Sequence, residues 1–502
     1  MTHAVKLAAL ILVALSTACA LVNPTSVASQ PPLDGVWEGR VEMVGMKKRF
    51  LLRFSSEQGR VSARLDVPSS FTEGFPLRDM AVSAGTIRFS ISMGGGMRLE
   101  SGEWRHLPLL VPGSEVAKLE FEGKIEGDSI LGKTTGGPFP GVFRLHRSRA
   151  ENPPTAAHPL SAGWSRKPRD DWPAREWKTS TPAAEGIDPR GLAEVERIFA
   201  EQRPEVRSLL LIRNGRLVYE KYFRGASAEQ AFNVKSVTKS FTSALTGIAL
   251  REGLLRSPGQ KLSELLPEYF DARTDARKRE ITLRHLLTMT AGFEWTENGT
   301  VTMEWNRSAD RTKFTLDLPL IVDPGKGHTY NSALSNLLSV IIARQSKVSL
   351  LEFARNQLFG PLGIRTQRWD TDQQGYYKGG SDLYLTARDM ARFGFLYLNA
   401  GQWEGKQIVP VEWIWESLRP YSAKDPFWAD YGYQWWIGQD DELPAFFASG
   451  YGGQMIHIVP KLDLVVIVTS TINDTGNDVL LPILKHILPA VRESNGRNRP
   501  AR

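Results

Sequence analysis

Between residues 33 and 147 hydrophobic and polar side chains alternate with a period of two. The alternation is clearest in a set of apolar residues separated by charged or hydroxyl side chains: Val61, Ala63, Leu65, Ile87, Phe89, Ile91, Leu119, Phe121 and Ile125. A period of two indicates β-strands with one face in water. Gly-rich breaks separate the runs and indicate hairpin turns, and no helical period intervenes. The segment 33–147 is therefore predicted to be all β.

A string of hairpins without helices closes most easily into a small barrel or sandwich. The opening Trp37-Glu38-Gly39 and the closing residues 141–145 resemble those of small lipocalin-like barrels. Barrels of this size usually have a core filled with side chains. We identify no candidate site in this segment.

Residues 148–180 have a different composition, with repeated prolines in a polar stretch that shows no hydrophobic period. Proline-rich, aperiodic sequence is typical of a linker. We expect this linker to wrap partly around the domain that follows.

From 181 to 493 strand and helix patterns mix. Apolar runs on both sides of Asn214-Gly215 predict a hairpin, because Asn-Gly favours the tight turn that joins two strands. A second hairpin is predicted at 455–469. Helical periods are predicted at 236–255, 283–289, 334–345, 350–357, 387–400 and 478–491. This segment is predicted to be an α+β domain in which helices cover an antiparallel sheet whose outer strands come from distant parts of the sequence.

Length and composition fit this division into two bodies. A chain of 502 residues is too long for one typical core, and 41% hydrophobic with 23% charged residues is typical of a globular protein. The net charge of +7 comes from basic residues interleaved with acidic ones, so nucleic-acid binding is not expected. No apolar run in the body of the chain is long enough to predict a membrane span.

The first 20 residues have the layout of a signal peptide: Lys6, then an aliphatic run at 7–15, then small residues up to Ala20. Cleavage after Ala20 would give a soluble periplasmic or secreted product. Cleavage before Cys19 would instead leave a cysteine for lipid attachment, the sole membrane contact that the sequence offers. We favour the first reading because Ser16 stands where a lipoprotein signal usually has leucine. Cys19 is the one cysteine of the chain, so no disulfide can form within it.

Candidate chemistry begins with Ser236-Val237-Thr238-Lys239. If Ser236 opens a helix, Lys239 lies three residues further on the same face, next to it. A serine hydroxyl becomes a good nucleophile when a neighbouring base takes its proton. Lysine can be that base if burial or nearby cations lower its pKa. By itself this two-residue pattern is weak, because it also occurs by chance on protein surfaces.

The surrounding sequence resembles the serine β-lactamase-like family, which comprises class C β-lactamases, penicillin-binding carboxypeptidases, related esterases and 6-aminohexanoate-dimer hydrolases. The resemblance is carried by five segments in the family's order: 232–243, 281–292, 323–332, 379–394 and 449–454. The third contains Tyr330-Asn331-Ser332, and the last contains Ser449-Gly450-Tyr451.

This resemblance implies roles for individual residues. Ser236 would be acylated, Lys239 would be the base, and Tyr330 would shuttle the proton. The backbone N–H groups of Ser236 and Tyr451 would form the oxyanion hole. Without the resemblance, Tyr330 would be interpreted as a buried core tyrosine. Ser332, Ser449 and Gly450 belong to the motifs that would contact the substrate.

Two departures from the family pattern bear on the substrate. Ser332 stands where the tyrosine motif commonly has asparagine, and Tyr-x-Ser is similar to the aminohexanoate-dimer hydrolases. Ala448 stands where the last motif commonly has lysine or histidine, so no cation is offered there to a substrate carboxylate. We therefore expect a small ester or amide as substrate. The alternative is a D-alanyl-D-alanine carboxypeptidase or a β-lactamase acting on peptide or lactam substrates.

A third reading is a binding or regulatory protein that keeps the fold without useful turnover, although all three catalytic side chains are present. The sequence contains no His-Glu-x-x-His helix, no cysteine ligand set and no phosphate-binding Gly-Lys-Ser/Thr loop. No metal or organic cofactor is therefore implied. The aromatic residues at 431–436 would line a cleft or belong to the core, and the sequence leaves both readings open.

Overall fold

A computed structural model describes most of the chain after residue 32. The described residues are 33–43, 46–58, 60–68, 72–92, 96–98, 104–106, 118–136, 140–149, 164, 169, 172–173, 176–366, 368–425, 429–438, 440–471 and 479–491. The predicted signal segment 1–20, with Cys19, lies outside them, and so does most of the predicted linker.

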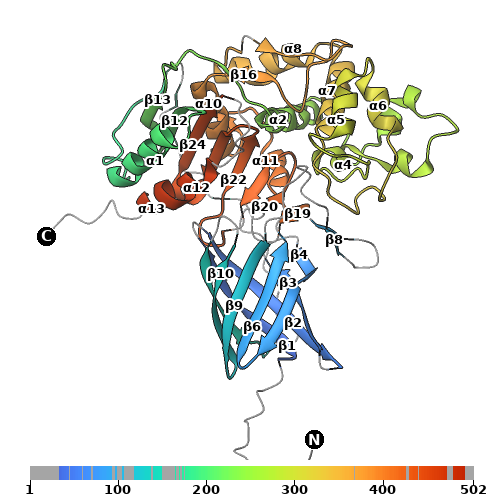
Figure 1. Ribbon diagram of the computed structural model, residues 1–502. Coiled ribbons are helices and arrows are strands. Elements are labelled where there is room, and N and C mark those ends of the chain that lie inside the picture. The colour runs from blue at the N-terminus through green and yellow to red at the C-terminus, as the bar shows by residue number, and fades with distance from the viewer. Residues whose placement is uncertain are drawn as a thin grey trace, which may run out of the picture. The chain divides into compact units, whose positions relative to one another are not determined.

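The N-terminal part is a nine-stranded antiparallel sheet that is nearly closed into a barrel (Figure 1). Its strands are β1 (Gly35–Met43), β2 (Met46–Glu57), β3 (Arg60–Val67), β4 (Thr72–Pro76), β5 (Arg78–Ser83), β6 (Thr86–Ser92), β9 (Lys118–Glu126), β10 (Ser129–Thr135) and β11 (Gly141–Arg147). They follow the order β4-β3-β2-β1-β11-β10-β9-β6-β5. The first strand pairs with the last, Trp37 opposite Arg147, which brings the two ends of the segment together. The predicted all-β fold is confirmed.

The barrel has a filled core. Trp37, Phe50, Phe121 and Phe143 are among the largest fully buried side chains of the described residues. The rings of Phe89 and Phe121 stack with centroids 4.6 Å apart, within the range that aromatic pairs prefer. The interior is therefore occupied by side chains, as the alternation of apolar positions predicts.

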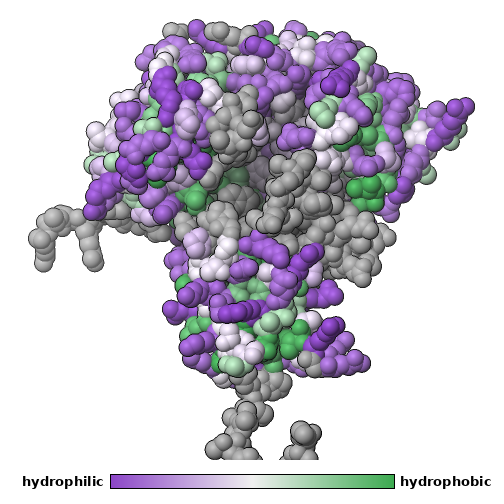
Figure 2. All heavy atoms as spheres, viewed as in Figure 1, coloured by the Kyte–Doolittle hydropathy of each residue, from purple (hydrophilic) through white to green (hydrophobic). Residues whose placement is uncertain are grey.

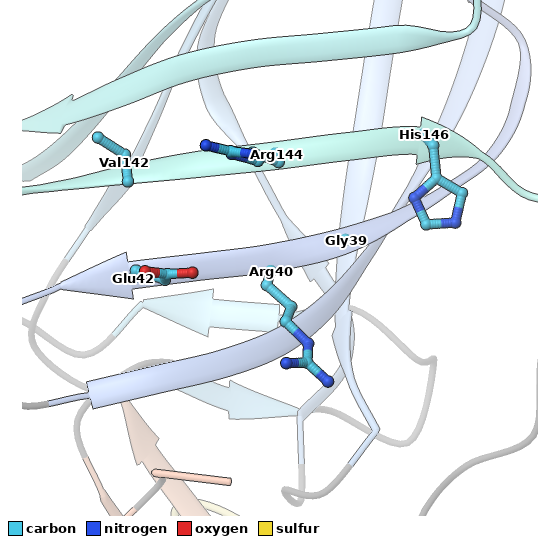
Figure 3. Close-up of a pocket in the computed structure, with 6 residues that line it drawn as sticks. All are labelled: Gly39, Arg40, Glu42, Val142, Arg144 and His146. Carbon is cyan, nitrogen blue, oxygen red and sulfur yellow. The ribbon is translucent and has the colours of Figure 1, made fainter. Parts of the chain in front are cut away.

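The outer wall of the barrel carries a shallow hollow of about 260 Å³ (Figure 3). Its lining residues come from β1 and β11: Gly39, Arg40, Glu42, Val142, Arg144 and His146. Figure 2 shows hydrophobic residues in patches among hydrophilic ones on this part of the chain. None of the predicted catalytic side chains belongs to this hollow.

The C-terminal part is built on an eight-stranded antiparallel sheet of order β13-β12-β24-β23-β22-β21-β20-β19. Its strands are β12 (Val206–Arg213), β13 (Arg216–Tyr222), β19 (Ser422–Asp425), β20 (Ala429–Tyr431), β21 (Trp436–Gly438), β22 (Phe446–Gly450), β23 (Gln454–Val459) and β24 (Leu464–Ser470). Both predicted hairpins are present. The first forms one edge of the sheet, and the second lies inside it because β24 pairs with β12 across more than 250 residues, with Leu211 opposite Val466.

Helices surround this sheet. The longer ones are α1 (Pro189–Glu201), α2 (Val237–Arg251), α5 (Thr300–Arg307), α7 (Ser332–Ser346) and α10 (Ala387–Leu398), with short α4 (Leu283–Leu287), α6 (Arg311–Asp317), α8 (Leu350–Ala354) and α11 (Val411–Ser417). Helices α2 and α10 pack on the sheet, and α7 packs on α2. None of the described helices is both long and apolar enough to cross a membrane.

Two predicted helices are interrupted. Helix α8 continues into a π-helical turn at Arg355–Phe359, and the C-terminal helix consists of Leu480–Pro482, a π turn at Ile483–Ile487 and Leu488–Ala490. Pro489 is one reason for the second interruption, because it has no backbone N–H to donate to the Lys485 carbonyl, as a regular helix would require. The hydrophobic period alone predicted both segments as uninterrupted helices.

A substitution at Gly132 would measure how tightly the side chains beneath the barrel wall are packed. This glycine faces Gly123 on β9, and a β-carbon at Gly132 would lie 2.6 Å from the Phe143 ring. We expect Gly132→Val to lower the free energy of unfolding by about 1–3 kcal/mol, because a well-packed core does not accept added methyl groups. Urea unfolding measures this. Leu131→Val, on the exposed face of the same strand, is the matched control, and equal stability of the two variants would contradict the prediction.

Candidate active site

Ser236 lies in a turn that its own neighbours hold in place. The short strand β14 (Phe232–Asn233) ends there, and the Asn233 side-chain oxygen accepts a hydrogen bond of 2.9 Å from the Lys235 backbone N–H. Lys235 has a φ of 49°, in the left-handed region that side chains rarely adopt. Ser236 then takes helical angles as the N-cap of α2. The sharp turn places the Ser236 side chain at the start of the helix, as the sequence predicts.

Lys239 is buried, with 1% of the residue exposed. Its Nζ contacts three oxygen atoms: Ser236 Oγ at 3.0 Å, Ser332 Oγ at 2.9 Å and the Gly380 carbonyl at 2.8 Å. Burial lowers the pKa of Lys239 to about 8, although the charges of Glu297 and Asp382 oppose the shift. A substantial fraction of Lys239 is therefore a neutral amine in mildly alkaline solution.

The hydrogen bonds around Lys239 determine what the neutral amine can do. The Gly380 carbonyl can only accept, so it takes one N–H. The Ser332 hydroxyl donates its single proton to Glu297, so towards Lys239 it also acts as an acceptor. A neutral amine has two N–H groups and one lone pair. Both N–H groups are thus committed, and the lone pair is left to accept the hydroxyl proton of Ser236.

Tyr330 lies beside this pair, in the loop before α7. Its hydroxyl shares a hydrogen bond with Ser236, and Lys239 Nζ lies 4.9 Å from the centre of its ring. Burial, together with the charge of Glu297, raises the pKa of Tyr330, so the phenol keeps its proton. The ring stacks on Trp436 with centroids 5.5 Å apart. Tyr330 is therefore a neutral hydroxyl in contact with Ser236.

The aromatic residues at 431–436 belong mainly to the core. Tyr431, Tyr433 and Trp435 are fully buried, and Trp436 is 9% exposed. Trp436 nevertheless forms the surface on which Tyr330 stacks. The core reading is correct for most of this segment, and Trp436 also supports the site.

Ser332 is held by Glu297. The Glu297 carboxylate accepts hydrogen bonds from the Ser332 hydroxyl, from the Ser332 backbone N–H at 3.1 Å and from Trp295 Nε1 at 2.7 Å. Asn331 caps α7 by accepting a hydrogen bond from the Ala333 backbone N–H. Because its proton is directed at Glu297, the Ser332 hydroxyl in this arrangement does not donate to a substrate.

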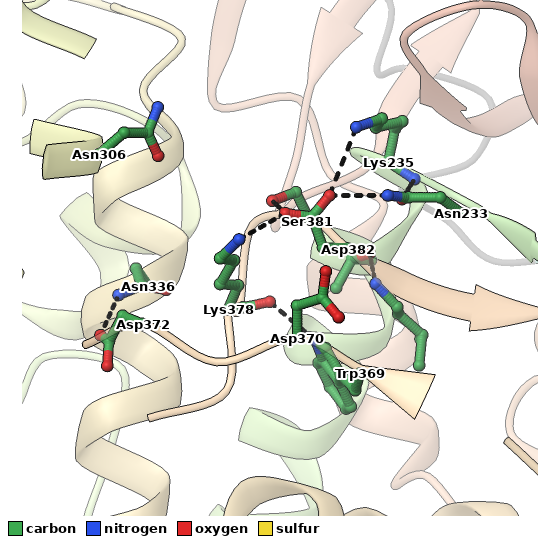
Figure 4. Close-up of polar contacts among 12 residues, drawn as sticks. Asn233, Lys235, Asn306, Asn336, Trp369, Asp370, Asp372, Lys378, Ser381 and Asp382 are labelled. Carbon is green, nitrogen blue, oxygen red and sulfur yellow. Dashed lines mark hydrogen bonds and ion pairs between the residues drawn. The ribbon is translucent and has the colours of Figure 1, made fainter. Parts of the chain in front are cut away.

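A second carboxylate, Asp382, also acts on Lys239 through its charge, and Figure 4 shows it between Lys235 and Lys378. It accepts hydrogen bonds from Asn233 Nδ2 at 2.8 Å and from Lys378 Nζ at 2.9 Å, and Lys235 Nζ lies 3.4 Å away. Burial raises the pKa of Asp382, but the hydrogen bonds from Asn233 and Lys378 outweigh it and hold the pKa well below its usual range. Asp382 is therefore ionised and surrounded by two cations.

The motif Ser449-Gly450-Tyr451 lies against the turn that contains Ser236. A β-carbon at Gly450, the final residue of β22, would lie 2.4 Å from the Val234 carbonyl and 3.1 Å from Lys235 Cβ. Glycine is thus required for this close approach. Ser449 precedes it in the strand, and Tyr451 follows with 40% of its surface exposed. A role for Tyr451 in an oxyanion hole therefore depends on its backbone N–H, since its side chain is in solvent.

The structure brings Ser236, Lys239, Tyr330 and Ser332 into direct contact and places Gly450 beside them. The sequence motifs did not point to Glu297 or to Gln434. The Gln434 amide donates to the Leu286 and Leu287 carbonyls and accepts from Ser335 Oγ at 2.6 Å, while its backbone carbonyl accepts from Ser240 Oγ. No spacing rule connects these residues to Ser236. Within the described part of the chain, no group of three or more His, Cys, Asp or Glu is arranged to hold a metal ion.

Residues 194–486 match the family model described as Beta-lactamase. This match spans more than half of the chain. The chain belongs to the beta-lactamase family. Members of this family share a hydrolase fold, and the sheet and helices described above are that fold.

Individual relatives agree with this assignment. The 6-aminohexanoate-dimer hydrolase of Paenarthrobacter ureafaciens is 25% identical over 352 residues, which is 63% of this chain and 89% of the relative. The solved structure of a proposed 6-aminohexanoate-dimer hydrolase from Bacillus anthracis superposes with a TM-score of 0.51 at 22% identity, covering 64% of this chain and 91% of that one. EstCE1, a hydrolase with promiscuous acyltransferase activity, superposes with a TM-score of 0.50 at 16% identity, covering 62% and 99%.

The reactivity of Ser236 should follow the protonation of Lys239. Only the neutral amine can accept a proton, so the rate of fluorophosphonate labelling should rise as the pH rises through about 8, the lowered pKa of Lys239, and level off above it. Mass spectrometry of the labelled chain at a series of pH values measures this. A midpoint near 10.5, the ordinary value for lysine, would contradict the lowered pKa.

Proposed function

We propose that this protein is a serine hydrolase that forms an acyl-enzyme at Ser236 and hydrolyses small esters or amides. The observation that carries the proposal is the hydrogen bonding of Lys239, whose two amine N–H groups are held by Ser332 and Gly380. The lone pair is thereby aimed at the Ser236 hydroxyl, 3.0 Å away. A nucleophile within hydrogen-bond reach of an oriented base is the arrangement that covalent catalysis needs.

The reaction would proceed in two balanced steps. In the first, Ser236 Oγ attacks the carbonyl carbon of the substrate while its proton passes to Lys239, directly or through the Tyr330 hydroxyl. The same proton then goes to the leaving alcohol or amine as the bond to it breaks. In the second step, a water molecule attacks the acyl carbon and gives a proton to the same base. The base passes this proton to Ser236 Oγ as the ester bond breaks, which releases the carboxylic acid and restores the Ser236 hydroxyl. Backbone N–H groups of Ser236 and Tyr451 would stabilise the oxyanion in both steps.

The surroundings of the site favour a substrate without a carboxylate that must be bound. Ala448 is buried and has no charge to offer. Of the described lysines around Ser236, Lys235 and Lys378 both pair with Asp382, and Lys239 is the base. The name of one relative points to an amide as the bond that is cleaved, since it hydrolyses an aminohexanoate dimer, and another relative is named for acyltransferase activity.

We also propose that the protein acts outside the cytoplasm, because of the predicted signal segment 1–20. Mass measurement of the N-terminus of the mature protein tests this. A chain that begins after Ala20 would mean a free exported protein, a lipidated Cys19 would mean an anchored one, and an unprocessed Met1 would refute export.

Replacing the nucleophile tests the mechanism. Ser236→Ala should lower the turnover of p-nitrophenyl acetate or p-nitrophenyl butyrate by roughly 10³-fold or more, because no hydroxyl remains to be acylated. Ser257→Ala, an exposed serine shortly after α2, is the matched control and should keep full activity. Equal turnover by wild type and Ser236→Ala would refute the serine mechanism, and the absence of both turnover and fluorophosphonate labelling would favour a binding protein.

Substrate choice gives a separate test. With purified wild type, we expect hydrolysis of the p-nitrophenyl esters or of an aminohexanoate dimer, whose carboxylate is separated from the scissile amide by a five-carbon chain. We expect at most weak hydrolysis of nitrocefin, whose carboxylate lies next to the lactam nitrogen and finds no cation at position 448. The measurement compares kcat/KM across the four compounds. Efficient turnover of nitrocefin with no turnover of the esters or the dimer would mean that the protein is a β-lactamase.

A further inference from the structure

Glu297 is connected to Lys239, the proposed general base, through one intervening side chain, that of Ser332. It lies in the loop between α4 and α5, 35 residues before Ser332 in the sequence. Trp295 donates its indole N–H to the Glu297 carboxylate and is itself 5% exposed, packed edge-on against Trp305 with ring centroids 5.8 Å apart. A rigid aromatic pair thus holds the Glu297 carboxylate in one place.

A chain of hydrogen bonds connects Glu297 to Ser236 through Ser332 and Lys239. An ionised carboxylate can only accept, so the Ser332 hydroxyl donates to it. Ser332 Oγ must then accept from Lys239 Nζ, at 2.9 Å. Lys239 Nζ in turn contacts Ser236 Oγ at 3.0 Å. The direction of the first bond therefore determines the direction of the others.

We propose that Glu297 is a positioning residue that, through Ser332, orients Lys239 towards Ser236 and stabilises the ammonium that forms when Lys239 takes the Ser236 proton. This inference rests on the proposed serine hydrolase mechanism and adds to it the group that assists the base. The proton moves from Ser236 Oγ to Lys239 Nζ, and nothing is transferred to Glu297. Its negative charge lowers the free energy of the new positive charge in a buried site.

The other carboxylate near Lys239 is less suited to this role. Asp382 also acts on Lys239, but its charge is offset by Lys235 and Lys378. Among the described residues, the groups that donate hydrogen bonds to Glu297 are neutral ones of Trp295 and Ser332. The remaining titratable groups around it, Tyr330 and Tyr431, are phenols whose pKa is raised by burial and by Glu297 itself. Glu297 is thus the carboxylate whose charge is left to act on Lys239.

Two substitutions of Glu297 separate the effect of its negative charge from the effect of the position of its carboxylate. Glu297→Gln keeps the size of the side chain and removes the charge, so the pKa of Lys239 should fall further and its titration should move to lower pH. Glu297→Asp keeps the charge and should leave the midpoint close to that of wild type, while the shorter side chain slows labelling. Glu294→Gln, an exposed carboxylate three residues away, is the matched control and should change neither quantity.

The experiment has two readouts. The ¹⁵Nζ resonance of Lys239 in ¹⁵N-lysine-labelled protein, assigned with Lys239→Met, reports the pKa without any need for activity. Fluorophosphonate labelling of Ser236 reports reactivity at each pH. We expect Glu297→Gln to lower the Lys239 midpoint and to reduce the labelling rate above that midpoint by about tenfold or more, since a misplaced base loses much of a general-base contribution.

The outcomes distinguish this inference from the proposed function. An unchanged or raised Lys239 midpoint in Glu297→Gln, or an equal shift in Glu294→Gln, would overturn the role of Glu297. Wild type that resists labelling while Lys239 still titrates as expected would instead overturn the serine mechanism and, with it, the positioning role. If Glu297→Gln does not fold, Glu297→Asp decides: slower labelling with an unchanged Lys239 midpoint supports the positioning role of Glu297, and labelling at the wild-type rate refutes it.

Discussion

The burial of one amine determines the arrangement of the whole site. Lys239 is enclosed on α2, and a buried ammonium is costly unless each of its protons is accepted. Three oxygen atoms from separate segments meet this need, from Ser236, Ser332 and the Gly380 carbonyl. The same burial lowers the pKa of Lys239, so that part of it is a neutral amine able to accept a proton in mildly alkaline solution. Stability and reactivity thus depend on the same contacts.

Helix α2 can carry this lysine in part because neighbouring buried hydroxyl groups on the same helix form hydrogen bonds to other segments. Ser240 donates to the Gln434 carbonyl, and Thr242 donates to the Gly379 carbonyl, each at 2.7 Å. These bonds attach to α2 the loop that supplies Gly380 and the strand connection that contains Gln434. Gln434 in turn contacts α4 and α7. The segments around the site are therefore fixed by hydrogen bonds inside the protein, where water does not compete.

The two carboxylates near Lys239 show how similar groups take different roles. Asp382 is surrounded by Asn233, Lys235 and Lys378, and its charge is largely balanced. It holds the strained turn before Ser236 in place, since Asn233 also bonds to the Lys235 backbone. Glu297 is bonded by neutral donors, and its charge remains available to Lys239. Position relative to other charges, rather than residue type, separates the structural carboxylate Asp382 from Glu297, for which we propose a role in assisting Lys239.

The sequence by itself determined the local features of this protein. Alternating apolar positions predicted the strands of the barrel, Asn214-Gly215 predicted a hairpin, and the spacing of Ser236 and Lys239 placed both at the start of one helix, because these patterns depend on neighbours along the chain. The tertiary structure decided the rest. The pairing of β12 with β24, the burial of Lys239 and the contacts of Glu297 and Gln434 join residues far apart in the sequence. Such contacts leave no periodic signal, because they arise only when separate segments pack together and exclude water from the polar groups between them.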